Sequence, residues 1–377
     1  MLESADRARE RYLAMHPPPE MGEQIAPGLT PDTQFFHLPE QLLRAYEKHR
    51  EGSLLGSVFE IANGMHDVLD AIVVFGTPDT ILGVKALHEA CCDPHHNEQD
   101  RATRGSKPRI YFAHDAMDND ATQSLMWRLE RGGYGDLKAE RDWMLIALDA
   151  ATRHSAVVEQ LLRAKPIDGV AVWHDGQFSN PILRGLEDRV FDTTHTKRGC
   201  SPHRIDRYWP LTPFGLLPAA FLGLDVVQLL VGAYEVTENF KTAPPEDNLV
   251  LRLASIVSLG VKQERQPAWC VWTEALRAMG DWMETCPWTR VLRSHAEADS
   301  KRNASFYQLL EVQEPRTDVL PGIEAHRDQL VEDLSESWKR KQILSTRLTL
   351  PRIDTHSMGQ LFQLLMLTSE MSDTLCS

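Results

Sequence analysis

Short apolar runs alternate with helix-length segments through the first half of this sequence. Residues Ala71–Phe75 are apolar throughout, as in a strand that is buried on both faces of a sheet. Further strands are expected at Arg109–Ala113, Trp143–Leu148 and Gly169–Trp173, with helices near 81–91, 120–131 and 154–164. This alternation predicts a mostly parallel sheet flanked by helices, in which ligands bind at the carboxyl ends of the strands.

Length favours two domains over one. The chain has 377 residues, which is long for a single hydrophobic core. We expect a helical lead-in over 1–60, a first α/β domain over 61–240 and a second over 248–377. In the second domain a strand is expected at 269–272, and residues 290–350 read as helices and loops. No internal repeat is evident, although two lobes of one type could be related.

Composition excludes some classes of partner. The net charge is −14, whereas a nucleic-acid-binding protein must supply lysine and arginine to displace counterions, so we expect no nucleic-acid partner. The amino terminus has no apolar signal core, and no run of 18 apolar residues occurs, so no membrane association is expected. Six scattered cysteines fit thiols in a reducing compartment, which predicts a cytoplasmic location.

One cluster has the chemistry of metal ligands. It contains Cys91, Cys92, His95 and His96. Adjacent cysteines and adjacent histidines rarely converge on one tetrahedral ion, so a helix end that runs into a loop at Pro94 is the preferred interpretation. We therefore expect no metal and no cofactor.

The densest motif of the chain lies between Leu211 and Ala233. It reads Leu-Thr-Pro-Phe-Gly-Leu-Leu-Pro-Ala-Ala, then Gly-Leu-Asp, then Leu-Leu-Val-Gly-Ala. This stretch resembles, without gaps, the signature region of the glucose-6-phosphate isomerase (phosphoglucose isomerase) family. The resemblance implies two sugar-isomerase (SIS) domains, each a mostly parallel sheet between helices in three α/β/α layers. It also implies aldose–ketose isomerisation between glucose 6-phosphate and fructose 6-phosphate, a phosphorylated-sugar ligand and a homodimer.

The first candidate phosphate loop is Gly76-Thr-Pro-Asp-Thr80, which resembles the glycine-rich loop of the family. Gly76 and Thr80 keep their positions, with Thr80 as a hydroxyl donor to the phosphate. The inner glycines are replaced, because Pro78 has no N–H to offer and Asp79 repels an anion. The alternative for Thr80 is an N-cap of the following helix.

The second candidate loop, Ala147–Ser155, resembles the family's serine- and threonine-rich phosphate loop. Thr152 and Ser155 fall on its hydroxyl positions. The lysine of the family motif is absent and Asp149 brings negative charge, although Arg153 is a cation that could compensate. An N-cap is the alternative role for Thr152.

Two residues are candidates for catalysis by resemblance. Arg207 falls on the family's arginine, which stabilises an enediolate-like intermediate, although Asp206 could instead hold it in an ion pair. His356, in the segment Asp354-Thr-His-Ser-Met-Gly-Gln, falls on the histidine that helps to open the sugar ring and reaches the neighbouring subunit. The alternative for His356 is a loop histidine that precedes a helix.

The family's catalytic glutamate is not matched. An ungapped extension places Thr289 there, and Glu284 is the nearest carboxylate; an inserted turn would instead bring Glu284 or Glu297 to this position. A threonine hydroxyl cannot take a carbon-bound proton near neutral pH. The sequence ends at Ser377, so we also expect the second domain to be truncated and to lack the family's lysine-bearing last segment. These features leave three possibilities: an isomerase with a rearranged site, an inactive relative that binds a phosphosugar or a protein, and a SIS enzyme with another substrate.

Overall fold

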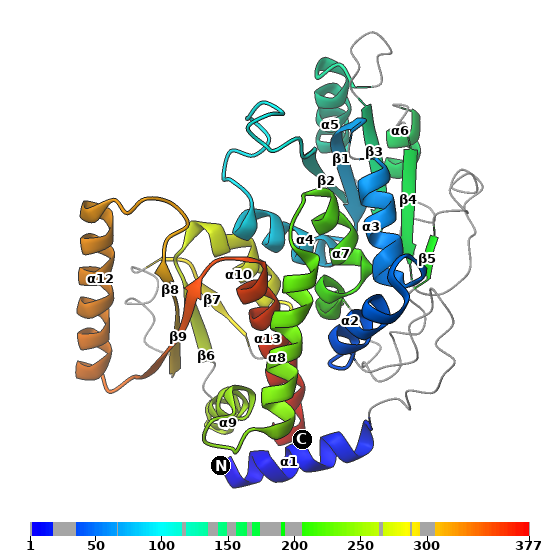
Figure 1. The fold of residues 1–377 in the computed structure, drawn as a ribbon. Helices are drawn as coiled ribbons and strands as arrows, with labels where there is room; N and C mark the ends of the chain where they lie inside the picture. The colour runs from blue at the N-terminus through cyan, green and yellow to red at the C-terminus, as the bar shows by residue number, and fades with distance from the viewer. Residues whose placement is uncertain are drawn as a thin grey trace. The chain divides into compact units, whose positions relative to one another are not determined.

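The structure is a computed structural model of the chain (Figure 1). It describes residues 2–17, 35–65, 67–114, 118–134, 142–148, 156–163, 168–173, 190–192, 206–263, 267–286, 289–294 and 306–376. The chain divides into two compact units. We call Pro18–His88 with Cys92–Leu230 the first unit, and Met1–Pro17, Glu89–Cys91 and Val231–Ser377 the second unit.

The first unit is built on a parallel sheet of order β2-β1-β3-β4-β5. Its strands are β1 (Leu69–Gly76), β2 (Arg109–His114), β3 (Asp142–Leu148), β4 (Asp168–Trp173) and β5 (Val190–Asp192). Every residue of β1 is buried, which confirms the interpretation of its apolar run as a central strand. The expected parallel α/β arrangement is therefore present.

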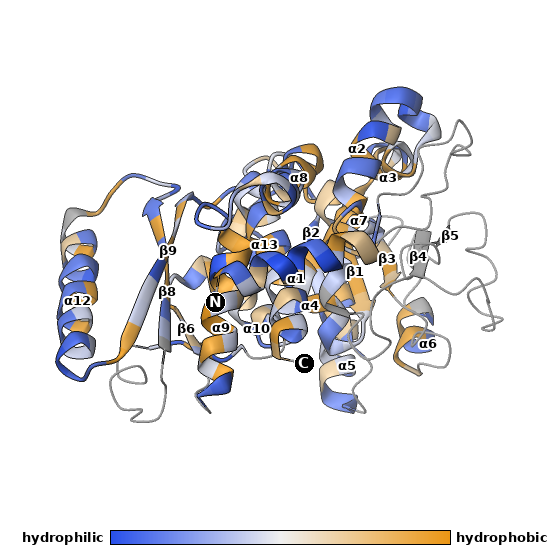
Figure 2. Cartoon of the chain, turned by 90° about the horizontal axis from the view of Figure 1, so that it is seen from below, coloured by the Kyte–Doolittle hydropathy of each residue, from blue (hydrophilic) through white to orange (hydrophobic). Residues whose placement is uncertain are grey.

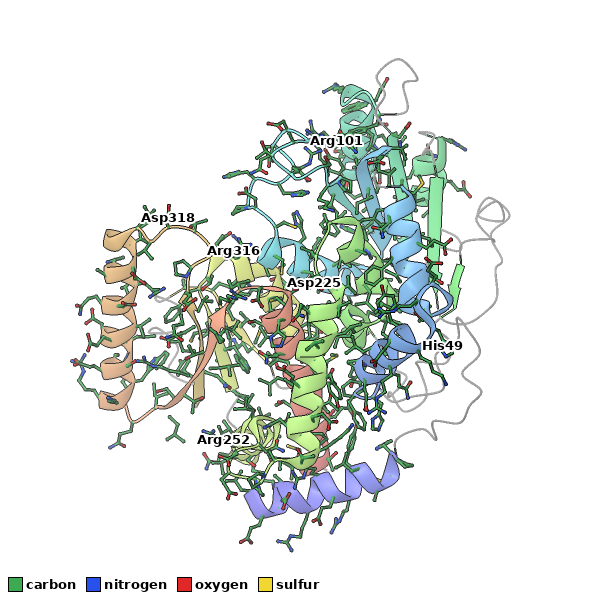
Figure 3. All side chains as sticks on the ribbon, in the orientation of Figure 1. His49, Arg101, Asp225, Arg252, Arg316 and Asp318 are labelled. Atoms are coloured by element: carbon green, nitrogen blue, oxygen red, sulfur yellow. The ribbon has the colours of Figure 1, made fainter. Side chains whose placement is uncertain are left out.

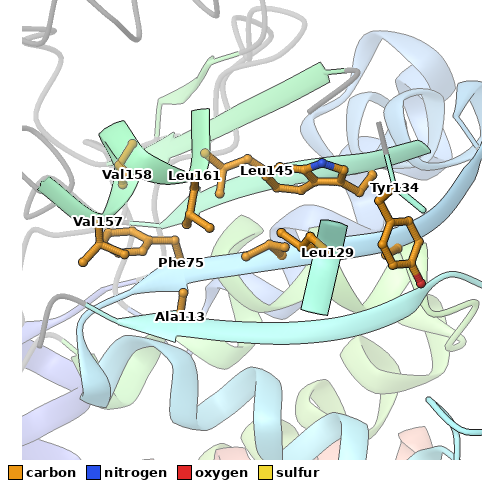
Figure 4. Packing of buried hydrophobic residues seen from close by; sticks show 11 residues of the cluster. Phe75, Ala113, Leu129, Tyr134, Leu145, Val157, Val158 and Leu161 are labelled. Atoms are coloured by element: carbon orange, nitrogen blue, oxygen red, sulfur yellow. The ribbon is translucent and has the colours of Figure 1, made fainter. Parts of the chain in front are cut away.

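Helices flank this sheet. They are α2 (Leu38–His49), α3 (Leu54–Gly64), α4 (Pro78–Cys91), α5 (Asn119–Arg131), α6 (Ala156–Arg163) and α7 (Pro213–Phe221). One face of the sheet packs against α5 and α6, where Phe75 and Leu145 meet Leu129, Val158 and Leu161 (Figure 4). The strand residues between them, such as Ile72 and Ile146, are also fully buried, as they must be when both faces of a sheet are covered.

A buried ion cluster holds the start of β1 to a neighbouring loop. The Asp70 carboxylate lies 3.0 Å from Nη2 of Arg104 and 2.6 Å from Nη1 of Arg109. Arg101, labelled in Figure 3, donates to the carbonyl of Leu69 at 3.0 Å. Because the Arg104 side chain has no exposed surface, its charge depends on Asp70 and on carbonyl oxygens of the loop.

The second unit contains a second parallel sheet, of order β7-β6-β8-β9. Its strands are β6 (Pro267–Val271), β7 (Val291–Leu292), β8 (Phe306–Glu314) and β9 (Leu344–Arg352). The expectation of helices and loops alone over 290–350 is therefore wrong, because β7, β8 and β9 lie there. In chain order, the four strands are arranged as the first four strands of the other sheet are.

The helices of the second unit are α1 (Leu2–Met15), α9 (Leu249–Lys262), α10 (Arg277–Met283), α12 (Pro321–Arg340) and α13 (Thr355–Cys376), with α8 (Val226–Thr242) entering from the first unit. Helix α13 packs along α9 and α1. Trp338 of α12 stacks on Tyr307 of β8 with ring centroids 4.7 Å apart.

Figure 2 shows β3 as hydrophobic and α1 as mostly hydrophilic. No described helix is long and apolar enough to cross a membrane.

Candidate functional site

The end of β1 lies at the topological switch point of the first sheet. The chain leaves β1 and β3 in opposite directions along the sheet, and in parallel α/β sheets ligands bind at the carboxyl ends of such a pair of strands. Gly76 ends β1, and a Cβ placed on it would stand 3.3 Å from the Cβ of Leu148 at the end of β3. Gly76 thus lies at this switch point, packed against the end of β3. Thr152 and Ser155, which follow β3, lie outside the described residues.

The first candidate phosphate loop folds directly into a helix. Helix α4 begins at Pro78, since proline is well suited to the first helical position, and Thr77 is the N-cap. The Thr77 hydroxyl accepts from the Thr80 N–H at 3.3 Å and lies 2.6 Å from the Thr80 hydroxyl. Thr80 is only 2% exposed. Thr77 therefore holds the N-cap position that the sequence interpretation offered to Thr80.

This capped turn has few groups left for an anion. Backbone N–H groups at a helix start normally bind phosphate. Here Pro78 has no N–H, the Thr80 N–H is bonded to Thr77, and Asp79 adds negative charge to the first turn. The turn lacks the features of a glycine-rich phosphate cradle.

Arg207 lies on a short 3₁₀ helix, Asp206–Leu211, that rests against α4. Its backbone is described and its side chain is not. A Cβ on Gly83 of α4 would stand 2.5 Å from Cγ of Pro210, and a Cβ on Gly215 would stand 2.2 Å from the Pro210 carbonyl oxygen. The two glycines therefore let α4 and α7 close on Pro210, which brings the turn that carries Arg207 beside α4.

The two residues after Arg207 are structural. Tyr208 stacks on Phe35 with centroids 4.4 Å apart, and Trp209 stacks on Phe214 at 4.1 Å. Both are buried. Trp209 stands where the family resemblance places a serine, so that position serves packing in this chain.

His356 lies in the first turn of α13, whose N-terminus is capped by Asp354. The carboxylate of Asp354 accepts from the Ser357 N–H at 2.8 Å. Burial alone would raise the pKa of Asp354, but hydrogen bonds from Ser357 and Arg352 outweigh it and lower that pKa. His356 is thus held on an ordered, capped helix start. Helix α13 begins at Thr355, so His356 is part of the helix and not of a loop before it.

The His356 ring faces a carboxylate of its own chain. Nε2 of His356 lies 3.1 Å from Oε2 of Glu235 on α8. Gln360, one turn further along α13, donates to the same Oε2 at 3.0 Å. The sequence gives no signal at Glu235, because its partner His356 is far away in the chain. Gln360, four residues after His356, was the one available signal, since such spacing places two side chains on one helix face.

Gly232 sets the separation of the two helices at this point. A Cβ on Gly232 would stand 2.1 Å from the His356 carbonyl oxygen. Glu235 lies three residues further along α8, on the same face as Gly232. The last glycine of the Leu211–Ala233 motif therefore allows the approach that brings Glu235 to His356.

Known proteins with a similar sequence are glucose-6-phosphate isomerases. The enzyme of Carboxydothermus hydrogenoformans is 25% identical over 254 residues, 66% of this chain and 50% of its own length. That of Rubrobacter xylanophilus is 26% identical over 265 residues, 66% of this chain and 54% of its own. The matches thus span about half the length of these relatives. No protein-family model matches the chain.

Solved structures support the same assignment of fold. A hypothetical protein of Thermus thermophilus superposes with a TM-score of 0.69 at 19% identity, over 98% of this chain and 89% of its own. A glucose-6-phosphate isomerase of Chlamydia trachomatis gives 0.67 at 15% identity, over 100% and 81%. The chain is therefore similar in sequence to glucose-6-phosphate isomerases and has a divergent form of their SIS fold.

Thr289 and Glu284, which the ungapped extension places at or near the family's catalytic glutamate, both make structural contacts. Thr289 donates its N–H to the Cys286 carbonyl at 3.3 Å. Oε1 of Glu284 accepts from the Val291 N–H at 3.2 Å, and Oε2 lies 3.2 Å from Arg293. These bonds tie Glu284 to the start of β7, which is a structural role.

The two histidines near the end of α4 have lowered pKa values. Burial, and then the nearby His96, lower the pKa of His88 to about 4. The His96 ring hydrogen-bonds the Pro108 carbonyl at 2.9 Å, and burial is the main cause of its own lowered pKa. Among the described residues, no group of three or more His, Cys, Asp or Glu side chains could hold a metal ion.

A groove of about 670 Å³ lies in the second unit, between β8, β9 and the first half of α12. Its charges are largely paired with each other, as in the 3.7 Å pair of Glu311 with Arg347. None of the residues predicted from the sequence as catalytic or phosphate-binding lines it. The groove is therefore separate from the site at His356.

Proposed function

We propose that this chain is a cytoplasmic, homodimeric isomerase of the glucose-6-phosphate isomerase type, which interconverts glucose 6-phosphate and fructose 6-phosphate. The observation that supports this most directly is the pairing of His356 with Glu235. A histidine at the position of the ring-opening residue, with a carboxylate on one ring nitrogen, has the composition of a general acid–base pair.

The proposed chemistry needs no added reagent. A ring nitrogen of His356 accepts the proton of the anomeric hydroxyl, the C1–O5 bond breaks with its electron pair moving to O5, and the proton is returned to O5. A base, which neither Thr289 nor Glu284 provides, then takes the C2 proton; its return to C1, with the O2 proton moving to O1, converts aldose to ketose through an enediolate. Arg207 stabilises the charge of this enediolate.

A second candidate function is a non-catalytic relative that binds a phosphorylated sugar or a protein. The capped turn Thr77–Thr80 favours it, because that turn offers few donors to a phosphate. The structural use of Glu284 favours it too, since the proton transfer between C2 and C1 needs a base.

A coupled assay of glucose 6-phosphate formation from fructose 6-phosphate tests the proposal. We expect turnover that His356→Ala and Arg207→Ala each reduce by about 100-fold or more, as for removal of an acid–base or charge-stabilising group. His326→Ala, on the exposed surface of α12, is the control and should keep wild-type rates.

Absence of turnover by folded wild-type protein would refute the isomerase proposal. The second candidate is then tested by thermal unfolding with fructose 6-phosphate. A ligand that binds only the folded chain raises the melting temperature, so a rise supports sugar binding and an unchanged curve supports a protein partner.

A further inference from the structure

We propose that Glu235 is the positioning residue for His356, fixing the ring in one tautomer with the proton on Nε2 and the lone pair on Nδ1. This inference rests on the proposed function only in its kinetic consequence. The assignment of the tautomer follows from the geometry of the described residues.

The contact between the two residues is set by backbone and side chains together. Gly232 allows the His356 backbone to approach α8, and Glu235 meets the ring one helical turn further on. Gln360 donates to the same carboxylate oxygen, so Glu235 is held from α13 at two points. Thr237 of α8 accepts from Gln363 of α13 at 2.8 Å, and both of these side chains are fully buried.

Among the described residues near the His356 ring, Glu235 is the acid that contacts the ring, and the neighbouring acids have other partners. Asp354, the other acid at the start of α13, is used by the Ser357 N–H and by Arg352, whose Nε lies 2.5 Å from its Oδ2. Glu238, one turn along α8 from Glu235, pairs with Lys241 at 2.9 Å. Each of these acids has a partner other than His356.

The contact with the Glu235 carboxylate determines which tautomer the neutral imidazole adopts. An ionised carboxylate only accepts hydrogen bonds, so a neutral ring at 3.1 Å must place its proton on Nε2. The lone pair then lies on Nδ1, which becomes the nitrogen that can take a proton from a substrate. The ring is meanwhile held in orientation, as by the aspartate of a Ser-His-Asp triad.

Histidine ring nitrogen NMR at pH 8 tests the tautomer directly. The His356 signals are assigned by their loss in His356→Ala. We expect a single Nε2–H tautomer in the wild type and in Glu235→Gln, which keeps an acceptor, and a mixture of tautomers in Glu235→Ala. An Nδ1–H ring in the wild type, or a spectrum that Glu235→Ala leaves unchanged, overturns the proposal.

Kinetics test the consequence. Glu235→Ala should lower kcat by about 10- to 100-fold, a part of what an acid–base group contributes, with KM changed less than about twofold. Glu235→Gln should recover most of kcat. Glu238→Ala removes a carboxylate from the same helix without touching His356, and should leave kcat unchanged.

The two proposals fail separately. Suppose that the wild type shows no turnover while the His356 ring is a single Nε2–H tautomer that becomes a mixture of tautomers in Glu235→Ala. In that case the isomerase proposal is wrong and the positioning role stands. If the wild type turns over and Glu235→Ala changes neither kcat nor the ring spectrum, the positioning role is wrong. A fall in kcat that Glu235→Gln does not recover, with an unchanged tautomer, is also a refutation.

Discussion

Gly232 allows α8 to approach the backbone of His356 closely. Gly232→Ala places a methyl group 2.1 Å from a backbone oxygen, so the helices must separate. We expect a loss of about 1–3 kcal/mol in the free energy of unfolding, the usual cost of overpacking, measured by urea denaturation.

Gly322 provides the matched control, because a Cβ there meets nothing within 4 Å. Gly322→Ala should change stability by less than about 1 kcal/mol, and in the favourable direction, since alanine limits the unfolded chain. Equal losses in the two variants would show that the contact between Gly232 and His356 does not limit stability.

Single residues show where sequence reasoning stops. Arg207 and His356 were reached by resemblance of short motifs. Glu235 was not, since its role comes from a contact between helices that are distant in the chain. The clamp of Asp70 by Arg104 and Arg109 was missed for the same reason, because charge patterns do not reveal which side chains become buried together.

Elements with strong patterns were predicted well. The runs expected to be the first four strands coincide with β1 to β4 within about two residues. In β1 and β3 nearly every residue is buried, which leaves little choice of residue. Strands β8 and β9 were missed. Most residues of β9 are exposed or only partly buried, so its sequence carries little hydrophobic signal. Helix α4 starts earlier than expected, since Pro78 was read as part of a turn.

Helix α4 also gives an expectation for stability against pH. The pKa of His88 is lowered to about 4 in the folded chain, below its ordinary value of 6.5. Between these two pH values, His88 binds more protons in the unfolded chain than in the folded chain. Its contribution therefore lowers the free energy of unfolding as pH drops from about 6.5 to 4, and has no effect above about 6.5. A shift of this size corresponds to a loss on the order of 3 kcal/mol.

Urea denaturation at several pH values measures this loss. In His88→Phe the fall between pH 6.5 and about 4 should be smaller by that amount, because the replacement ring does not titrate. His326→Gln removes an exposed histidine and should leave the profile unchanged. Identical profiles for wild type and His88→Phe would contradict the assignment.

At the scale of the whole molecule, the two sheets share one strand arrangement. The sequence predicted two α/β lobes but showed no repeat, because the common feature is the order of strands and not the identity of residues. The division at 61–240 and 248–377 remains a proposal, and the observed units place α1 with the second sheet.

The proposed homodimer predicts complementation. If His356 completes the site of the partner subunit, a heterodimer of His356→Ala with Arg207→Ala chains contains one intact site and one empty site. Co-expression with two different tags isolates this species, and we expect about half the activity of the wild-type dimer. Each variant alone should retain about 1% of the wild-type activity or less. An inactive heterodimer would show that each chain uses its own His356.

The strand order also bears on how the chain is made. The central strand β1 pairs with β3, so Ile72 meets Met144 only after about 70 further residues have been synthesised, and contacts of such separation form slowly. Until then, eight consecutive residues that end fully buried, Leu69–Gly76, have an unpaired edge. Strand β6 waits for β8 in the same way. Nascent chains of this protein should therefore need protection from self-association at two separate stages of translation.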